Sequence, residues 1–149
     1  MTLVIRTFAA VDEAAVVALW RAAGLTRPWN DPHKDIARKQ AVQPELFLIG
    51  ELAGEIIATA MAGYDGHRGS VYYLAVSPAH QRGGHARAMM DEVERRLAQM
   101  GCPKLNLMVR RDNSVAIGFY ERIGYDEQSV TTLGKRLIDD EPRKPSAGD

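Results

Sequence analysis

Residues 71–97 read VYYLAVSPAHQRGGHARAMMDEVERRL, and this stretch says more about the fold than any other part of the chain. Val71–Val76 is rich in β-branched and aromatic residues, which predicts a buried strand, and Ser77–Pro78 ends that strand. From about Gly84 to Gln99, apolar residues recur at helical spacing and predict a long helix. We therefore expect a strand, a glycine-containing loop and a helix, in that order.

The loop between that strand and that helix suits an anion. Backbone N–H groups at a helix N-terminus have no partner within the helix, and the helix dipole places partial positive charge there. Gly83 and Gly84 let the backbone come close to a ligand, and Arg82 and Arg87 add charge beside it. The loop contains neither a GxxxxGK motif nor a GxGxxG motif. A plain strand-to-helix turn, in which the glycines serve only the geometry, is the alternative.

Outward from this stretch, the chain alternates further strands and helices. The other expected strands are Leu3–Phe8, Leu46–Glu51, Glu55–Tyr64 and Leu105–Val109, with one or two closing strands over Glu127–Thr131 and Thr132–Ile138. The other expected helices run from a cap at Asp12 to Gly24, over His33–Ala41, and from a cap at Asp112 or Asn113 to Ile123. The order β-α-α-β-β-β-α-β-α-β-β predicts a mixed central sheet flanked by helices, which is an α/β (α+β) fold.

The length and composition indicate one globular domain. The chain has 149 residues, and hydrophobic residues make up 46% and charged residues 26%, which argues against disorder. We expect one domain over residues 1–140. The segment Glu141–Asp149 has no large apolar side chain and is expected to be a disordered tail.

Charge and cysteine content exclude several classes of protein. Lys+Arg and Asp+Glu both number 19, so the net charge is zero and nothing points to a nucleic-acid partner. The longest apolar run, Ala14–Trp20, is too short to span a bilayer, and Met1–Ala10 lacks the pattern of a signal peptide. Cys102 is the single cysteine, which excludes a cysteine zinc cluster. A cytoplasmic, metal-free protein without a membrane partner is expected.

A second informative stretch, Asn113–Tyr125, has the pattern N-x-x-A-x-x-x-Y-x-x-x-G-Y. Ala116, Phe119 and Tyr120 share one face of the predicted helix. Taken alone, Tyr120 is explained as a core aromatic. Beside a thioester, a tyrosine could instead donate a proton, because a phenol pKa of about 10 lies above a thiol pKa of about 8.5.

The two stretches together resemble the GNAT acetyltransferase superfamily. The resemblance rests on Q-x-x-G-x-A after a strand and N-x-x-A-x-x-x-Y further along, and it extends from Leu3 to about Asp140. It is closest to the YpeA-type acetyltransferases, on the segments Arg27–Pro32, Tyr64–Gly69 and Leu133–Leu137. The stretch around Asn113 and Tyr120 is also similar to the N-terminal acetyltransferases of ribosomal proteins.

The resemblance implies acetyl-CoA as co-substrate and an amine as acceptor, with direct transfer and no covalent enzyme intermediate. Backbone groups of Leu74, Ala75 and Val76 would pair with the pantetheine arm at a splayed strand edge. A backbone N–H near Val76 would polarise the thioester carbonyl. The loop and helix start that would hold the CoA pyrophosphate comprise Gln81, Arg82, Gly83, Gly84, His85, Ala86 and Arg87.

On the second stretch, the resemblance implies that Asn113 bonds the pantetheine and that Ala116 and Phe119 pack on it. Tyr120 would protonate the departing thiolate. Many relatives supply a glutamate that takes the proton of the amine, at positions that are Met108 and Ser70 here.

Neither Met108 nor Ser70 is a strong base, so another group must act directly or through a water. His67 suits this role by its ordinary pKa, with Asp65 close by in the chain, and Tyr72 or Tyr73 could anchor a water. An exposed loop histidine is the alternative for His67.

Two loops are expected to line the acceptor pocket, Thr26–His33 and Tyr64–Ser70. Their candidate substrate-binding residues are Trp29, Asn30, Asp31, Asp65 and Arg68. The two aspartates could bind a cationic amine and Arg68 a carboxylate, which suggests an amino acid or peptide. The alternative is that Asp31 caps the following helix and that Arg68 is solvated.

The activity that these signals favour is acetyl-CoA-dependent N-acetylation of a small molecule, amino acid or peptide. A CoA-binding sensor or scaffold without catalysis is the first alternative, and a nucleotide- or phosphate-binding module is the second. The sequence leaves a longer acyl group open, and a homodimer formed through the last strands is possible.

Overall fold

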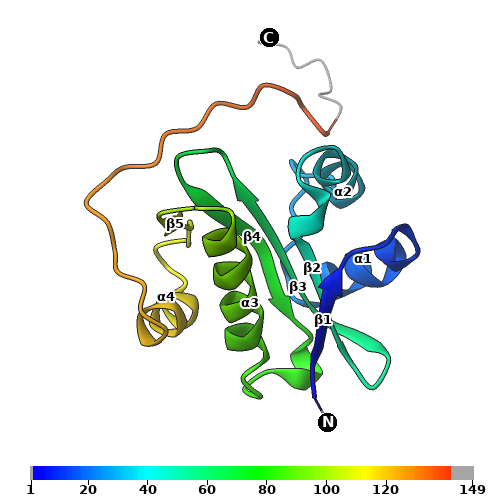
Figure 1. Cartoon of the computed structure of the whole chain (residues 1–149). Helices are drawn as coiled ribbons and strands as arrows, with labels where there is room; N and C mark the ends of the chain where they lie inside the picture. Colours follow the sequence, from blue (N-terminus) through cyan, green and yellow to red (C-terminus); the bar gives the residue numbers. More distant parts are fainter. Residues whose placement is uncertain (1, 142–149) are drawn as a thin grey trace.

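Five hydrogen-bonded strands form one sheet in the computed structural model, which describes residues 2–141 (Figure 1). The strands are β1 (Val4–Thr7), β2 (Phe47–Leu52), β3 (Glu55–Tyr64), β4 (Gly69–Val76) and β5 (Leu105–Asn106). They are paired in the order β1-β2-β3-β4-β5, and all neighbours are antiparallel except β4 and β5, which are parallel.

Helices cover both faces of this sheet, as Figure 1 shows. The long helices are α1 (Glu13–Ala22), α2 (Pro32–Ala41), α3 (His85–Gln99) and α4 (Ser114–Arg122), and the 3-10 turns are η1 (Ala10–Asp12), η2 (Pro44–Leu46) and η3 (Pro78–His80). α1 and α2 pack on one face, and α3, with α4 beside it, packs on the other. The predicted fold class is thereby confirmed. Among residues 2–141, every helix is too short or too polar to cross a bilayer.

Alternating side chains along the strands build two cores. On β2, Leu48 packs on the α3 side, whereas its neighbours Phe47 and Ile49 pack on the α1 and α2 side. α3 contributes the buried stripe Met89, Met90, Val93 and Leu97. Each large apolar side chain that is fully buried stabilises the fold by roughly 1.5–3 kcal/mol.

β4 contains one residue more than the part of β3 with which it pairs. Thr59 pairs with Ala75 and Met61 pairs with Tyr72, so one residue of β3 lies opposite two residues of β4. Tyr73 has a φ of +52°, in the left-handed region that residues other than glycine seldom adopt. Such a bulge bends its strand and increases the local twist.

Hydrogen bonds and ring packing hold the bulge in place. The Thr59 hydroxyl donates to the carbonyl of Tyr73 at 2.8 Å and accepts from the indole N–H of Trp20 at 2.9 Å. The Tyr73 ring stacks on Trp20 with centroids 3.8 Å apart, and its hydroxyl donates to the Asp35 carboxylate at 2.6 Å. Burial and the neighbouring Asp35 raise the pKa of Tyr73, so the phenol stays a donor at neutral pH. Contacts from α1, α2 and β3 thus fix the bent part of β4.

The chain after α4 differs from the sequence prediction. Closing strands are expected over Glu127–Thr131 and Thr132–Ile138, but neither segment contains a strand in the described structure. Leu133 and Leu137, which the pattern assigns to a sheet, are 91% and 87% exposed. An alternating pattern gives a strand only where a neighbouring strand can pair with it, and this segment leaves the sheet as extended chain. The prediction of closing strands was therefore wrong, as Figure 1 shows.

Two further details of the sequence prediction were wrong. The strand expected over Leu105–Val109 is hydrogen-bonded only at its first two residues, because it diverges from β4 after Ser70. The Asp12 side chain does not cap α1, because its carboxylate accepts from the Arg6 guanidinium at 2.7 Å and from the Ala9 N–H at 2.8 Å. Most of the expected tail, residues 142–149, lies outside the described residues.

Replacing Thr59 by valine tests the support of the bulge. Thr59 is fully buried, and Thr59→Val leaves the Trp20 N–H and the Tyr73 carbonyl without their partner. We expect the free energy of unfolding to fall by about 2–4 kcal/mol, measured by chemical denaturation. Thr2→Val, at an exposed position, is the control and should change stability by less than about 0.5 kcal/mol. Equal stability of the two variants would contradict this role of Thr59.

Candidate active site

The edge of β4 that faces β5 is open along most of its length. Pairing with β5 involves only Gly69–Ser70, and residues 71–76 have no neighbouring strand on that side within the described chain. Leu74, Ala75 and Val76, which the sequence analysis assigns to a pantetheine arm, lie on this edge immediately after the bulge. Backbone groups on an open strand edge can pair with an extended polar molecule.

The start of α3 follows this edge. The Gln81 side-chain amide donates to the Val76 carbonyl at 3.4 Å and ties the loop to the strand end. Arg82 and Gly84 take the left-handed conformation, with φ of +67° and +77°. α3 has no side-chain cap, so the N–H groups of its first turn lack a protein acceptor. Binding of an anion at this loop stays a prediction.

Two histidines border the loop. A Cβ at Gly83 would lie 2.9 Å from the His85 Nε2 atom, which shows how closely the His85 ring covers the backbone there. The His80 Nδ1 atom is buried and has no hydrogen-bond partner among the described residues. Buried polar atoms without a partner are uncommon in folded proteins. The sequence analysis assigned nothing to His80, because a lone histidine forms no pattern.

α4 brings the second motif to the same side of the sheet as α3 (Figure 1). The Asn113 side-chain oxygen accepts the Ala116 N–H at 3.1 Å and caps the helix, which leaves its amide N–H₂ available as a donor. Ala116 is partly buried, and Phe119 packs edge-on against Tyr120 with centroids 5.0 Å apart.

Tyr120 combines a partly buried ring with an unoccupied hydroxyl. Its ring packs against the α3 core, and the hydroxyl has no hydrogen-bond partner among the described residues. Burial raises the pKa of Tyr120 to about 12, so the phenol is protonated at neutral pH. The nearby Tyr125 hydroxyl instead donates to the Glu94 carboxylate at 2.6 Å. Of these two tyrosines, only Tyr120 has a proton free to give to a ligand.

The loop between β3 and β4 is stabilised by its own aspartate. The Asp65 carboxylate accepts the backbone N–H groups of His67 and Arg68, both at 2.8 Å, and these bonds lower its pKa. The Arg68 guanidinium donates to the His67 carbonyl at 3.0 Å. The His67 residue is exposed. These three residues share one loop, and their assigned roles stay predictions.

The loop before α2 places the other predicted residues together. Asp31 caps α2 by accepting the N–H groups of His33 at 2.9 Å and Lys34 at 3.3 Å, so the capping alternative is confirmed. Trp29 is 47% exposed, and the side-chain oxygen of Asn30 accepts from Arg136 at 2.6 Å. A substrate contact for these loop residues stays a prediction.

The end of the described chain binds this loop. Asp140 forms an ion pair with Arg38 of α2 and accepts the Asp31 N–H at 2.9 Å. Its carbonyl accepts from Lys34 at 3.4 Å. The Arg38 guanidinium and the Asp31 N–H lower the pKa of Asp140 to about 2, so this contact persists across the physiological pH range. The sequence analysis missed Asp140, because its partners are far away in the chain.

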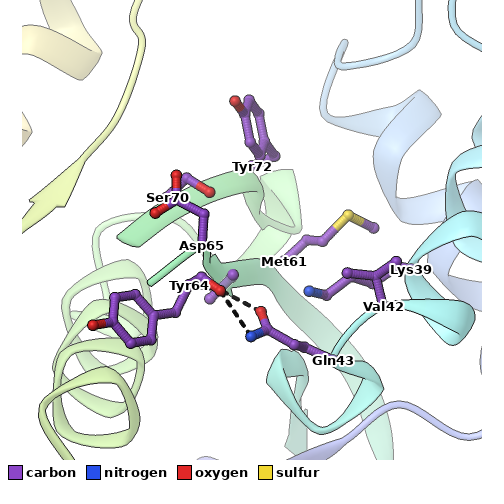
Figure 2. Close-up of a pocket in the computed structure, with 10 residues that line it drawn as sticks. Lys39, Val42, Gln43, Met61, Tyr64, Asp65, Ser70 and Tyr72 are labelled. Carbon is purple, nitrogen blue, oxygen red and sulfur yellow. Dashed lines mark hydrogen bonds between the residues drawn. The ribbon is translucent and has the colours of Figure 1, made fainter. Parts of the chain in front are cut away.

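A pocket of about 320 Å³ lies between α2 and the end of the β3–β4 hairpin (Figure 2). It is lined by Lys39, Val42, Gln43, Met61, Ala62, Gly63, Tyr64, Asp65, Ser70 and Tyr72. The sequence analysis named Asp65, Ser70 and Tyr72 but missed Lys39. The helical spacing could have indicated that Lys39 is buried. Lys39 follows Ile36 by three residues, and so lies on the same, buried face of α2. Among the described residues, no group of three or more potential ligands could hold a metal ion.

Comparison with known proteins agrees with this geometry. A model of the acetyltransferase (GNAT) family matches residues 14–125. An acetyltransferase of Yersinia enterocolitica is 50% identical over 137 residues, which cover 92% of this chain and 97% of that protein.

Two solved structures share the fold. One is a ribosomal-protein-alanine N-acetyltransferase from Escherichia coli, with a TM-score of 0.73 and 23% identity over 86% of this chain and 80% of that one. The other is AAC(6')-Iy in complex with a CoA-containing bisubstrate analogue, with a TM-score of 0.73 and 17% identity over 92% of this chain and all of that one. At these identities the likeness shows the fold alone.

The protonation state of Tyr120 can be measured directly. Its raised pKa, about 12 against an ordinary value of 10.0, means that it should not form phenolate between pH 9 and about pH 11. The ultraviolet phenolate signals of the native protein and of Tyr120→Phe should therefore coincide over that range, with circular dichroism checking that both stay folded. A phenolate that titrates near pH 10 and is lost in the variant would contradict the burial of this group.

Proposed function

The chain belongs to the GNAT acetyltransferase family and is an acetyltransferase, and on that premise we propose that it moves an acetyl group from acetyl-CoA directly to a primary amine. The acceptor is a small molecule, an amino acid or a peptide. The observation that carries this proposal is the free, protonated Tyr120 hydroxyl on α4, which lies on the α3 side of a sheet whose β4 edge is open.

The residues present fit acetyl-CoA as the donor. The pantetheine arm is extended and amide-rich, and the open edge at Leu74, Ala75 and Val76 offers backbone partners for it. The uncapped start of α3 offers N–H groups for the pyrophosphate, with Arg82 and Arg87 supplying charge. The Asn113 amide can donate to the same arm. Acetyl-CoA supplies an acetyl group activated as a thioester.

The transfer forms one bond and breaks one. The neutral amine attacks the thioester carbonyl, the C–N bond forms, the C–S bond breaks, and the amine loses one proton. A backbone N–H near Val76 stabilises the charge on the carbonyl oxygen. Tyr120 donates a hydrogen bond to the departing sulfur. Because a phenolate is a stronger base than a thiolate, complete transfer of the proton is uphill, so the hydrogen bond from the phenol to the sulfur stabilises the charge that develops as the C–S bond breaks and solvent supplies the proton that the thiol finally carries.

The acceptor amine has to lose its proton before attack. The two positions where relatives carry glutamate are Met108, which is 59% exposed, and Ser70, and neither takes a proton at neutral pH. We propose His67 for this role, directly or through a water, because its ring is exposed on a loop next to the pocket. A pH–rate profile that is identical in His67→Ala would remove His67 from the mechanism.

The two alternatives from the sequence are less well supported. A CoA-binding sensor needs no proton donor at the thioester, whereas Tyr120 is kept free and protonated. A nucleotide- or phosphate-binding module needs the α3 loop alone, whereas the family match also includes α4. A cytoplasmic location stays a prediction.

We also propose a homodimer. The extended segment after α4 exposes Val130, Leu133, Leu137 and Ile138, and a second copy of the chain would cover these apolar side chains. A monomer in sedimentation equilibrium at micromolar concentration would contradict this.

Release of the CoA thiol from acetyl-CoA tests the proposed function. The purified protein is assayed with a panel of primary amines, amino acids and short peptides. We expect one class to stimulate release, and Tyr120→Phe to lower kcat by about 100-fold with little change in the KM for acetyl-CoA.

Tyr125→Phe is the matched control, because it removes a neighbouring hydroxyl that is bonded to Glu94 rather than free. It should retain kcat within a few-fold. Full turnover in Tyr120→Phe would exclude the phenol as proton donor. Binding of CoA without stimulated release by any acceptor would favour the sensor.

A further inference from the structure

The pocket in Figure 2 is lined by a lysine whose ammonium forms no ion pair with any described residue. Lys39 is 9% exposed, and its Nζ atom makes no hydrogen bond or ion pair with any described residue. Figure 2 shows the amine end of Lys39 directed toward the interior of the pocket, beside Met61. Lysine is seldom buried without a counter-charge, because removing an ammonium from water costs several kcal/mol.

The surroundings of Lys39 do not compensate its charge. Burial lowers the pKa of Lys39, and Glu45, the acidic group that opposes this effect, lies beyond ion-pair distance. By contrast, Lys34 on the same helix is exposed and donates to the Asp140 carbonyl. The ammonium is therefore not neutralised by an ion pair among the described residues, and its Nζ atom remains accessible to an anion that enters the pocket.

The glycine at position 63 creates the space beside this ammonium. A Cβ built there would lie 3.7 Å from the Lys39 Nζ, 3.8 Å from the Ser70 Oγ and 3.5 Å from the Gln43 Oε1. The φ of Gly63 is not positive, so its backbone conformation does not require glycine. What the glycine provides is the space that a side chain would fill. A small polar group could occupy this room between the ammonium and the hydroxyl.

Most of the polar groups that remain free here can donate. The Gln43 amide donates one N–H to the Tyr64 carbonyl and accepts the Tyr64 N–H, at 2.8 Å each, which leaves one N–H and one lone pair of its oxygen without a partner. Ser70 and Tyr72 have hydroxyls without a partner among the described residues. An ammonium and two hydroxyls favour an anion. The pocket lining has one cation, and it includes neither an arginine, which could bind a phosphate through two N–H groups, nor a helix N-terminus. Such a lining suits a carboxylate better than a phosphate.

We propose that the Lys39 pocket binds the carboxylate of the acceptor, so that the acceptor is an amino-acid-sized molecule carrying both an amine and a carboxylate. The inference rests on the proposed function and narrows its acceptor. Asp65 at the pocket edge supplies the opposite charge and attracts the ammonium form of the amine. Tyr72 and Leu74 lie two residues apart on β4, so the pocket and the proposed donor edge share one strand. The proposal assigns the carboxylate to Lys39, whereas the sequence analysis assigned it to Arg68, whose guanidinium donates to the His67 carbonyl.

Acceptors in matched pairs test the carboxylate preference. Each amino acid is compared with its uncharged carboxamide in the CoA-release assay. We expect the acids to have the higher kcat/KM, by about tenfold or more, and Lys39→Met to remove that difference mainly through KM. Because Lys39→Met replaces a buried charge by an apolar side chain of similar length, the variant should fold. Lys135→Met, which removes an exposed lysine, should leave the preference unchanged.

A binding measurement separates this inference from the transfer reaction. N-acetylglycine and N-acetylglycinamide are titrated into the protein while the ¹³Cε resonance of Lys39, assigned by its loss in Lys39→Met, is followed. We expect a saturable shift with the acid and none with the amide.

Gly63→Ala places a methyl group at ordinary contact distance in the proposed carboxylate position, so it should fold normally and abolish the shift. A shift without any transfer would uphold the pocket and count against the proposed function. Transfer without a shift and without a preference for acids would overturn the pocket and leave the proposed function standing.

Discussion

One tyrosine in a left-handed conformation shapes the strand on whose edge we propose the donor site. The bulge that contains Tyr73 follows Ser70, where pairing between β4 and β5 ends, and the edge beyond Ser70 has no neighbouring strand in the described chain. Such a conformation is strained for a residue with a side chain. It persists because Thr59 satisfies the Tyr73 carbonyl, Trp20 supports Thr59, and Asp35 holds the phenol. The core on the α1 and α2 side thereby shapes the edge that the proposed donor occupies.

The two ends of β4 serve the two substrates in this account. After the bulge, the strand runs to the loop at Gln81 and the uncapped start of α3, which suits a pyrophosphate. Before the bulge, Ser70 and Tyr72 line the pocket that contains Lys39. The acetyl group would be transferred near the bulge, between these two regions. Tyr120, on α4, packs against the core on the α3 side of the sheet, and burial raises its pKa to about 12.

Local patterns in the sequence predicted the parts of this arrangement that depend on neighbouring residues. The strand Val71–Val76, the glycine loop and the long helix are encoded within one continuous stretch, and the cap at Asn113 is read from a single residue. Contacts between distant segments were not predictable in this way. The left-handed Tyr73 depends on Thr59 and Trp20, and the burial of Lys39 depends on the β3–β4 hairpin. The closing strands failed for the same reason, because their apolar alternation has no strand to pair with in the described chain.

Mapping CoA on the backbone amides tests the central claim that the open β4 edge and the start of α3 form the donor site. The measurement is a titration of unlabelled CoA into ¹⁵N-labelled protein, followed by amide chemical shifts. We predict the largest changes at residues 74–76, at residues 82–87 and at Asn113, with little change in β1 and β2. Saturable binding with the largest changes elsewhere on the sheet, or no binding at millimolar CoA, would contradict the account.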